Sequence, residues 1–148
     1  MVPRKQRIRV VLDTNVFVRA LKTRSSASPN QRIVRLWLTE KRLQLVVSDG
    51  LVDEYLGIFQ DILGMDPTLI ENWQRRFLAD SRSSLVSLGR RYTESRDPDD
   101  NLLLATATAG KAAYLITNDL DLLELPSGFQ RSLRFEVVTP GRFIRVWS

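Results

Sequence analysis

Four carboxylates stand at points along the chain from which they could meet at one edge of a folded domain. Asp13 ends the apolar run IRVVL, Glu54 follows SDGLVD, Asp100 precedes NLLLATATAG, and Asp119 lies two residues beyond AYLIT. Two carboxylates about 4 Å apart repel by about 4 kcal/mol at an effective dielectric constant near 20. A divalent cation between them removes that repulsion, and an all-oxygen ligand set favours Mg²⁺ or Mn²⁺. We therefore expect these acids to form a metal site.

The composition limits the chemistry that these acids can join. The 148 residues include no cysteine and no histidine, which excludes disulfides, thiolate or imidazole catalysis, and zinc sites built from His or Cys. The 22 Lys and Arg residues outnumber the 17 Asp and Glu residues, and the formal net charge is +5. A basic surface around an acidic centre suits a polyanion such as nucleic acid. The combination indicates a metal-dependent nuclease.

Apolar runs alternate with amphipathic segments along the chain. Five runs predict strands, at residues 8–13, 43–48, 85–89, 113–117 and 135–139. Other segments predict helices, at residues 15–23, 29–41, 49–63, 67–80 and 98–110, with one or two helical turns at 140–147. This order predicts one α/β domain over residues 1–148, with a mainly parallel central sheet of four to five strands flanked by helices. The active crevice of such a sheet lies outside the carboxyl ends of its strands.

The sequence Asp97-Pro98-Asp99-Asp100 is typical of a helix start. Asp97 suits the N-cap, Pro98 suits the first helical position, and acids in the first turn face the positive end of the helix dipole. Capping therefore accounts for Asp97 and Asp99. It accounts less well for Asp100, which stands four residues before Leu104 of the apolar face and can point toward the edge of the sheet.

Structural roles are the alternative for Asp13 and Glu54. Asp13 could form an Asx turn or cap the next helix, but Thr14 can serve as that cap. Glu54 lies at the edge of the apolar stripe of its helix and can reach the crevice, whereas Asp53 points away from the stripe. Simple surface exposure is the alternative for Glu54. The stripe consists of Leu51, Tyr55, Ile58 and Ile62.

Four motifs follow one another in a specific order. They are a strand-ending Asp before Thr-Asn, a helical Glu, an Asp before an Ala/Thr-rich helix, and Thr-x-Asp after a strand, within LDTNVFVRAL, SDGLVDEYLGIF and DPDDNLLLATATAGKAAYLITNDLDLL. With the closing TPGRFI, these segments resemble the PIN-domain family, especially the VapC-like toxins of bacterial and archaeal toxin–antitoxin pairs. The resemblance implies a PIN-like α/β/α sandwich. It also implies a Mg²⁺- or Mn²⁺-dependent ribonuclease that is inhibited by a cognate antitoxin and can form a homodimer.

The resemblance assigns roles to particular residues. The catalytic, metal-binding acids would be Asp13, Glu54, Asp100 and Asp119, with the metal activating a water for attack on an RNA phosphodiester. Glu54 would be a ligand or a water-orienting base. Polar support for this centre would come from Asn15 and Thr117, with outer contacts from Asp121 and Asp99.

Further expectations concern partners and location. Arg19, Lys22 and Arg24 could contact RNA phosphates, although solvated surface charge also explains them. Helix-spaced aromatic residues are expected in the core; if exposed, they could form a groove for an antitoxin helix or a dimer mate. The chain has neither a membrane-length apolar run nor the features of a secretory signal at its N-terminus, so we expect a cytoplasmic protein without a membrane partner.

Two other functions stay open. One is a non-catalytic RNA- or partner-binding module on the same fold. The other is a phosphatase similar to haloacid dehalogenases, which also begins with a strand-ending Asp and uses magnesium. That class needs a second Asp two residues later, where this sequence has Asn15, so it is the weaker alternative.

Overall fold

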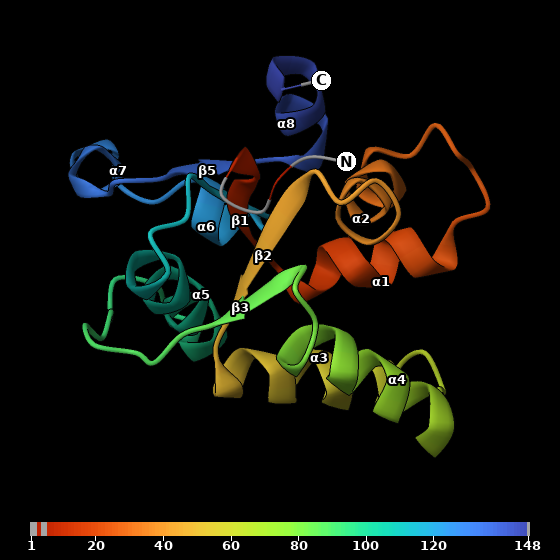
Figure 1. Cartoon of the computed structure of the whole chain (residues 1–148). Coiled ribbons are helices and arrows are strands. Elements are labelled where there is room, and N and C mark those ends of the chain that lie inside the picture. Colours follow the sequence, from red (N-terminus) through yellow and green to blue (C-terminus); the bar gives the residue numbers. More distant parts are fainter. Residues whose placement is uncertain (1–2, 4–5, 148) are drawn as a thin grey trace.

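Five parallel strands form the centre of the molecule (Figure 1). The computed structural model describes residue 3 and residues 6–147. The strands are β1 (Ile8–Leu12), β2 (Leu43–Val47), β3 (Ser83–Leu85), β4 (Tyr114–Ile116) and β5 (Glu136–Val138). Their order is β3-β2-β1-β4-β5, and every neighbouring pair is parallel. The predicted α/β fold with a parallel central sheet is confirmed.

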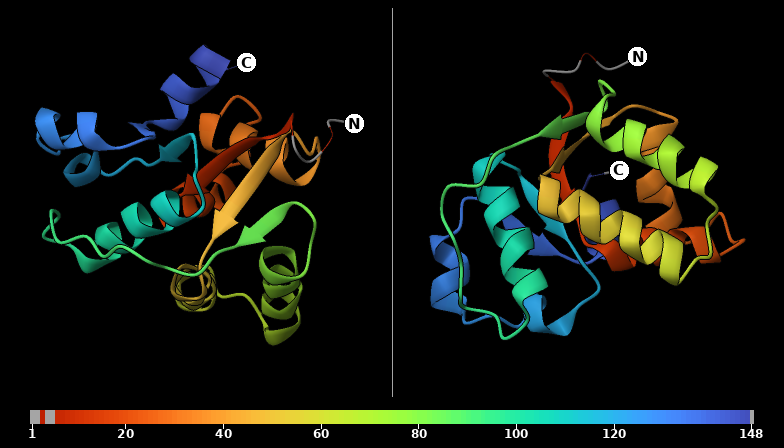
Figure 2. Two further views of the ribbon diagram at one scale, coloured as in Figure 1. Left: turned by 60° about the vertical axis from the view of Figure 1, so that its left-hand side comes forward. Right: turned by 90° about the horizontal axis from the view of Figure 1, so that it is seen from below.

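Helices flank this sheet on both sides. They are α1 (Thr14–Lys22), α2 (Pro29–Leu38), α3 (Asp49–Asp61), α4 (Pro67–Leu78), α5 (Pro98–Ala109), α6 (Leu120–Leu123), α7 (Ser127–Ser132) and α8 (Pro140–Trp147). In Figure 1, α5 lies on one side of the sheet, and α1 and α2 lie on the other. Figure 2 shows α3 next to α5 when the molecule is seen from below. Within the described residues, no helix is long and apolar enough to cross a membrane.

The middle strand, β1, determines where its terminal acid lies. Val10, Val11 and Leu12 are fully buried, as expected for the central strand of a parallel sheet that is covered on both faces. The pairing with β4 continues beyond the end of β1, where the Asp13 N–H donates to the Ile116 carbonyl at 2.9 Å. The carboxyl ends of β1 and β4 therefore lie side by side.

Six aromatic rings form the core that holds α1 to α4 together. The Phe17 ring is in contact with the other five, at centroid distances of 4.9 to 6.1 Å. The six are Phe17, Trp37, Tyr55, Phe59, Trp73 and Phe77, all buried. Burial contributes about 1.5–3 kcal/mol for a large apolar side chain, and edge-to-face pairs add about 0.5–1.5 kcal/mol. The expectation of helix-spaced aromatic residues in the core, made for Trp37, Trp73 and Phe77, is confirmed.

The packing of α5 on the sheet depends on the glycine that follows it. As predicted, the helix ends at Gly110, which occupies the C-cap position. Its φ of −89° is ordinary, so backbone conformation does not require glycine there. The reason is space, because a Cβ at Gly110 would lie 2.1 Å from Val46 Cγ1 of β2. Glycine therefore lets the end of α5 approach the central strands.

Several predicted boundaries differ from the structure. The strand predicted at 85–89 was wrong, because β3 covers Ser83–Leu85 and pairs Ser83 with Leu45. The apolar side chains that suggested the later position lie at the surface, with Leu85 49% and Leu88 42% exposed. Helices α2, α3 and α4 each end two or three residues earlier than predicted. The acidic segment after β4 contains α6, and α7 follows it; neither was predicted.

Candidate active site

Three of the four predicted acids meet at the carboxyl edge of the sheet. One carboxylate oxygen each from Asp13, Asp100 and Asp119 lies within 4.8 Å of the other two. Asp13 follows β1, Asp119 follows β4, and Asp100 lies in the first turn of α5. The parallel pairing of β1 with β4 and the packing of α5 against both strands account for this convergence.

Hydrogen bonds hold the Asp13 carboxylate in place. Its Oδ2 accepts from the Thr117 hydroxyl at 2.6 Å and from the Asn15 amide at 3.1 Å. Behind it, the buried Tyr55 hydroxyl donates to the Leu12 carbonyl. Burial raises the pKa of Asp13, and the charge of Asp119 raises it further, while the hydrogen bonds act in the opposite direction. Asn15 thus serves as a donor where a dehalogenase-like phosphatase needs an acid.

Asp100 is almost completely buried, with 3% of its surface exposed. Its Oδ2 accepts a hydrogen bond from the Ser95 hydroxyl at 3.0 Å. Burial raises the pKa of Asp100 to about 7, with added contributions from the charges of Asp119, Asp97 and Asp13. The fold therefore holds this carboxyl where it is not readily ionised below neutral pH, unless a positive charge compensates.

Asp119 is the N-cap of α6. Its Oδ1 accepts from the Asp121 N–H at 2.9 Å, and its own N–H donates to the Thr117 hydroxyl oxygen at 2.9 Å. The neighbouring Asn118 connects this turn to α1 through the Asn15 side-chain oxygen at 3.3 Å. Thr117 thus contacts both Asp13 and the backbone of Asp119, which fixes the separation of the two acids.

Among the described residues, the acidic triad consists of Asp13, Asp100 and Asp119, and Glu54 lies beside it rather than in it. Its Oε2 accepts from the Thr14 hydroxyl at 2.9 Å. The pKa of Glu54 is raised to about 7, chiefly by burial. Asp99 raises it further through a side-chain hydrogen bond and through its charge, and the charge of Asp13 acts in the same direction. The prediction that Thr14 caps α1 was wrong, because Asp13 occupies the N-cap position and the Thr14 hydroxyl is directed to Glu54.

The other predicted residues lie at the starts of α5 and α6 and near the end of α1. Asp97 caps α5 as predicted, through a 2.9 Å bond from the Asp99 N–H to its Oδ1. Asp99 is exposed and reaches Glu54, whereas the exposed Asp121 contributes its backbone N–H to Asp119. The predicted phosphate contacts lie in the last turns of α1 and just beyond its C-terminal end. They are Arg19, Lys22 and Arg24, all exposed.

Sequence reasoning missed two positioning groups. Ser95 lies in an irregular segment before α5, where no periodic pattern points to a role. Only the serine hydroxyl close before an Asp-rich helix start could have suggested it. Asn118 was also missed, although it stands between Thr117 and Asp119 and donates to Asn30 Oδ1 at 2.9 Å.

The donor set of the triad fits a hard divalent cation. Oxygen ligands on one Mg²⁺ lie at about 2.1 Å from the ion, and hence within about 4.2 Å of one another. The three carboxylate oxygens, all within 4.8 Å, are close to that arrangement. Burial, and after it the neighbouring carboxylates, raise the pKa values of Asp13 and Asp100, so ionising these acids costs free energy that a cation would offset.

Comparisons with known proteins agree with this fold. Among solved structures, a chain of VapBC2 from Rickettsia felis, in a complex bound to a DNA fragment from its promoter, matches with a TM-score of 0.56 and 17% sequence identity. The match covers 89% of this chain and 98% of that chain, and it shows a shared fold. No curated protein sequence matches the chain. A family model described as PIN domain matches residues 9–121, which include all four predicted acids. The chain therefore belongs to the PIN-domain family.

Proposed function

We propose that this protein is a metal-dependent endoribonuclease and the toxin component of a toxin–antitoxin pair. The observation that carries the proposal is the meeting of the Asp13, Asp100 and Asp119 carboxylates within 4.8 Å at the carboxyl edge of the sheet. Membership of the PIN-domain family supports nuclease activity. The similarity in fold to a chain of VapBC2 supports an antitoxin partner.

Each residue of the site has a distinct role in this proposal. Asp13, Asp100 and Asp119 hold Mg²⁺ or Mn²⁺, and Thr117 and Asn15 orient the first of them. When bound, the cation supplies positive charge at the scissile phosphate and lowers the pKa of a water molecule. The Glu54 carboxyl, with a pKa of about 7, can take up or release a proton near neutral pH.

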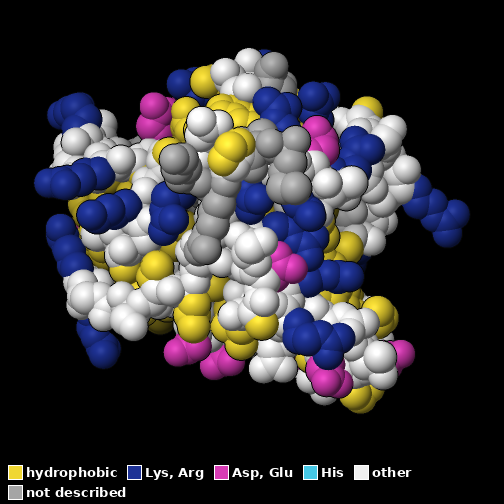
Figure 3. All heavy atoms as spheres, in the orientation of Figure 1, with side chains coloured by type: hydrophobic (Ala, Val, Ile, Leu, Met, Phe, Trp, Pro, Cys, Tyr) yellow, Lys and Arg dark blue, Asp and Glu magenta, His cyan; other side chains and the backbone are white. Residues whose placement is uncertain are grey.

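The charge distribution suits a polyanionic substrate, as the proposed RNA would be. Lys and Arg side chains are spread over the face shown in Figure 3, where acidic side chains are fewer. The net charge of +5 would hold a polyanion close to the acidic centre. Arg19, Lys22 and Arg24 remain candidates for phosphate contacts. A cytoplasmic location and a homodimer remain predictions.

RNA cleavage by the purified protein tests the proposal. We expect internal cleavage of an end-labelled RNA with Mg²⁺ or Mn²⁺, and no cleavage with EDTA. Asp13→Asn and Asp119→Asn should each slow cleavage by about 100-fold or more, since the cation contributes several kcal/mol and each 1.4 kcal/mol is tenfold in rate. The matched control is Asp53→Asn, at an exposed position of α3, which should cleave at the wild-type rate.

Two outcomes would point elsewhere. If folded Asp13→Asn and Asp119→Asn proteins cleave as fast as wild type, the site is assigned wrongly. If the wild-type protein binds RNA but does not cleave it with either metal, the non-catalytic module is the better description.

A further inference from the structure

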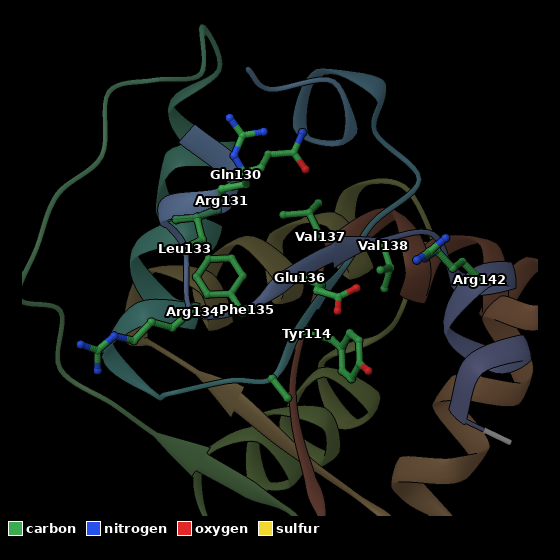
Figure 4. A pocket seen from close by; sticks show the side chains of 11 residues that line it. Tyr114, Gln130, Arg131, Leu133, Arg134, Phe135, Glu136, Val137, Val138 and Arg142 are labelled. Atoms are coloured by element: carbon green, nitrogen blue, oxygen red, sulfur yellow. The ribbon is translucent and has the colours of Figure 1, made fainter. Parts of the chain in front are cut away.

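A groove runs along β5 at the open edge of the sheet, and its lining includes none of the four acids. Its volume is about 740 Å³, within the range of about 300–1,000 Å³ that is typical of ligand-binding clefts. Glu136, Val137 and Val138 line it along the strand, and residues of α7 and α8 stand at its ends (Figure 4). We refer to it as the β5 groove.

The backbone of β5 offers hydrogen-bonding groups to this groove. The Glu136 N–H donates to the Ala113 carbonyl at 3.1 Å, and the Val138 carbonyl accepts from the Thr117 N–H at 3.0 Å. Residues 136 and 138 therefore direct their backbone groups toward β4. Because successive residues of a strand alternate in this direction, the N–H and C=O of Val137 point to the open edge. Such an edge is a template for an added strand.

Three arginines surround this edge. Arg131 of α7, Arg142 of α8 and Arg134, which lies between α7 and β5, all line the groove, and all three are exposed. Figure 4 shows them at different ends of the groove, around β5. Glu136 is the one acid of the lining. The ion pairs of the described residues, Arg75–Glu71 and Arg82–Asp80, involve none of these arginines. The groove is therefore complementary to negative charge.

The groove also has an apolar floor. Tyr114 of β4 lies opposite Glu136 in the sheet and packs edge-to-face on Phe143 of α8, with ring centroids 5.2 Å apart. Phe135 and Leu133 extend the apolar lining toward α7. A ligand that alternates apolar and acidic side chains would match both parts, because neighbouring side chains of a strand point to opposite sides.

We propose that the β5 groove binds an extended acidic peptide of a partner protein, which adds to the sheet as a strand beside β5. The open backbone groups of Val137 favour a peptide over a nucleic acid, because an RNA strand has phosphates but no amide and carbonyl at strand spacing. A second copy of this chain is disfavoured, since it would bring the same three arginines to the interface. The binding requires neither the acidic triad nor cleavage activity, so it is independent of the function proposed above.

Fluorescence polarisation with the full chain tests the charge requirement. The probe is a labelled decapeptide of alternating Glu and Val, compared with one of alternating Gln and Val. We expect the Glu peptide to bind at least tenfold more tightly. Arg131→Glu/Arg142→Glu should weaken its binding at least tenfold. The control Arg32→Glu/Arg35→Glu changes the same charge at exposed positions of α2 and should change binding less than twofold.

Hydrogen exchange tests the added strand. Saturation with the Glu peptide should slow exchange of the Val137 amide at least tenfold, and Asp13→Asn should not alter this result. Equal binding of the two peptides, or an unchanged Val137 amide at saturation, would overturn the proposal. The proposal would also be overturned by a different pattern of binding in EDTA. In that pattern a uridine decamer binds, the Glu peptide does not, and Arg131→Glu/Arg142→Glu abolishes the binding of the decamer.

Discussion

Polar side chains at the amino end of the parallel strands form hydrogen bonds with one another, whereas those at the carboxyl end are acids that repel. At the amino end, donors meet acceptors: Gln44 Nε2 donates to the Ser81 carbonyl at 3.0 Å and to Ser84 Oγ at 2.9 Å. Arg7 Nη1 donates to Gln44 Oε1 at 3.2 Å. At the carboxyl end, three acids meet one another. One sheet therefore has one end whose side chains are mutually satisfied and one end whose charges conflict.

This difference separates stability from function. The amino end contributes hydrogen bonds that are complete within the chain. At the carboxyl end, Thr117 and Ser95 orient Asp13 and Asp100 without removing the repulsion between the acids. The fold thus maintains an unfavourable arrangement that a bound cation would make favourable.

The largest expected effect is on the pH dependence of stability without metal. The pKa values of Asp100 and Glu54 are about 7 in the fold, whereas unfolded chains have values near 4. The folded protein binds these protons more tightly, so the free energy of unfolding should fall as pH rises from about 4 to about 7. We expect a loss of about 4 kcal/mol, after allowance for screening of the half-buried Glu54.

Urea unfolding in EDTA between pH 4.5 and pH 8 measures this loss. Saturating Mn²⁺ should reduce it, because the cation competes with the protons. A metal-free protein that is as stable at pH 8 as at pH 4.5 would show that ionisation of the acids at the carboxyl end does not destabilise the fold.

At the amino end, Gln44→Leu should destabilise the protein by about 3 kcal/mol. It removes three hydrogen bonds from a fully buried side chain, each contributing about 1 kcal/mol. Urea unfolding measures the change, and Mn²⁺ affinity is the control, which should stay at the wild-type value. A loss of Mn²⁺ affinity in the folded variant would mean that the two ends are coupled.

At the carboxyl end, Asp100→Asn should have the opposite sign. It removes one of the three converging charges and should stabilise the metal-free protein at pH 8 by about 2 kcal/mol. The same substitution should abolish stabilisation by Mn²⁺ in thermal unfolding. Asp53→Asn, which changes the same charge on the exposed face of α3, should do neither. Destabilisation by Asp100→Asn in EDTA would show that the charge of Asp100 does not destabilise the metal-free fold.

The smallest effect concerns Asp80, just before β3. Two hydrogen bonds from Arg82, at 2.6 and 2.7 Å, lower the pKa of Asp80 to about 2. This stabilisation is present above pH 4 and is lost as pH falls toward 2. Asp80→Asn should therefore cost about 1 kcal/mol at pH 7 and nothing near pH 2. An equal cost at both pH values would indicate a packing effect instead.

The sequence was sufficient for the order of the main elements and for the convergence of three acids. Strand-ending acids in a parallel sheet share one edge, so Asp13 and Asp119 could be placed from pattern alone. The position of β3 could not, because the strand begins at the polar Ser83 and Ser84, whereas the apolar Leu85 and Leu88 are exposed rather than buried. The role of Ser95 depends on the path of the irregular segment before α5, and no periodic pattern in the sequence predicts that path.

Calorimetric titration of Mn²⁺ into the metal-free protein at pH 7 tests directly whether Asp13, Asp100 and Asp119 form a metal site. We expect binding accompanied by proton release, because Asp100 and Glu54 are partly protonated at this pH. The released protons appear as a dependence of the binding heat on the ionisation enthalpy of the buffer. Both the binding and the proton release should be lost in Asp13→Asn. No binding to the wild-type protein, or equal binding to Asp13→Asn, would contradict a metal site formed by these acids.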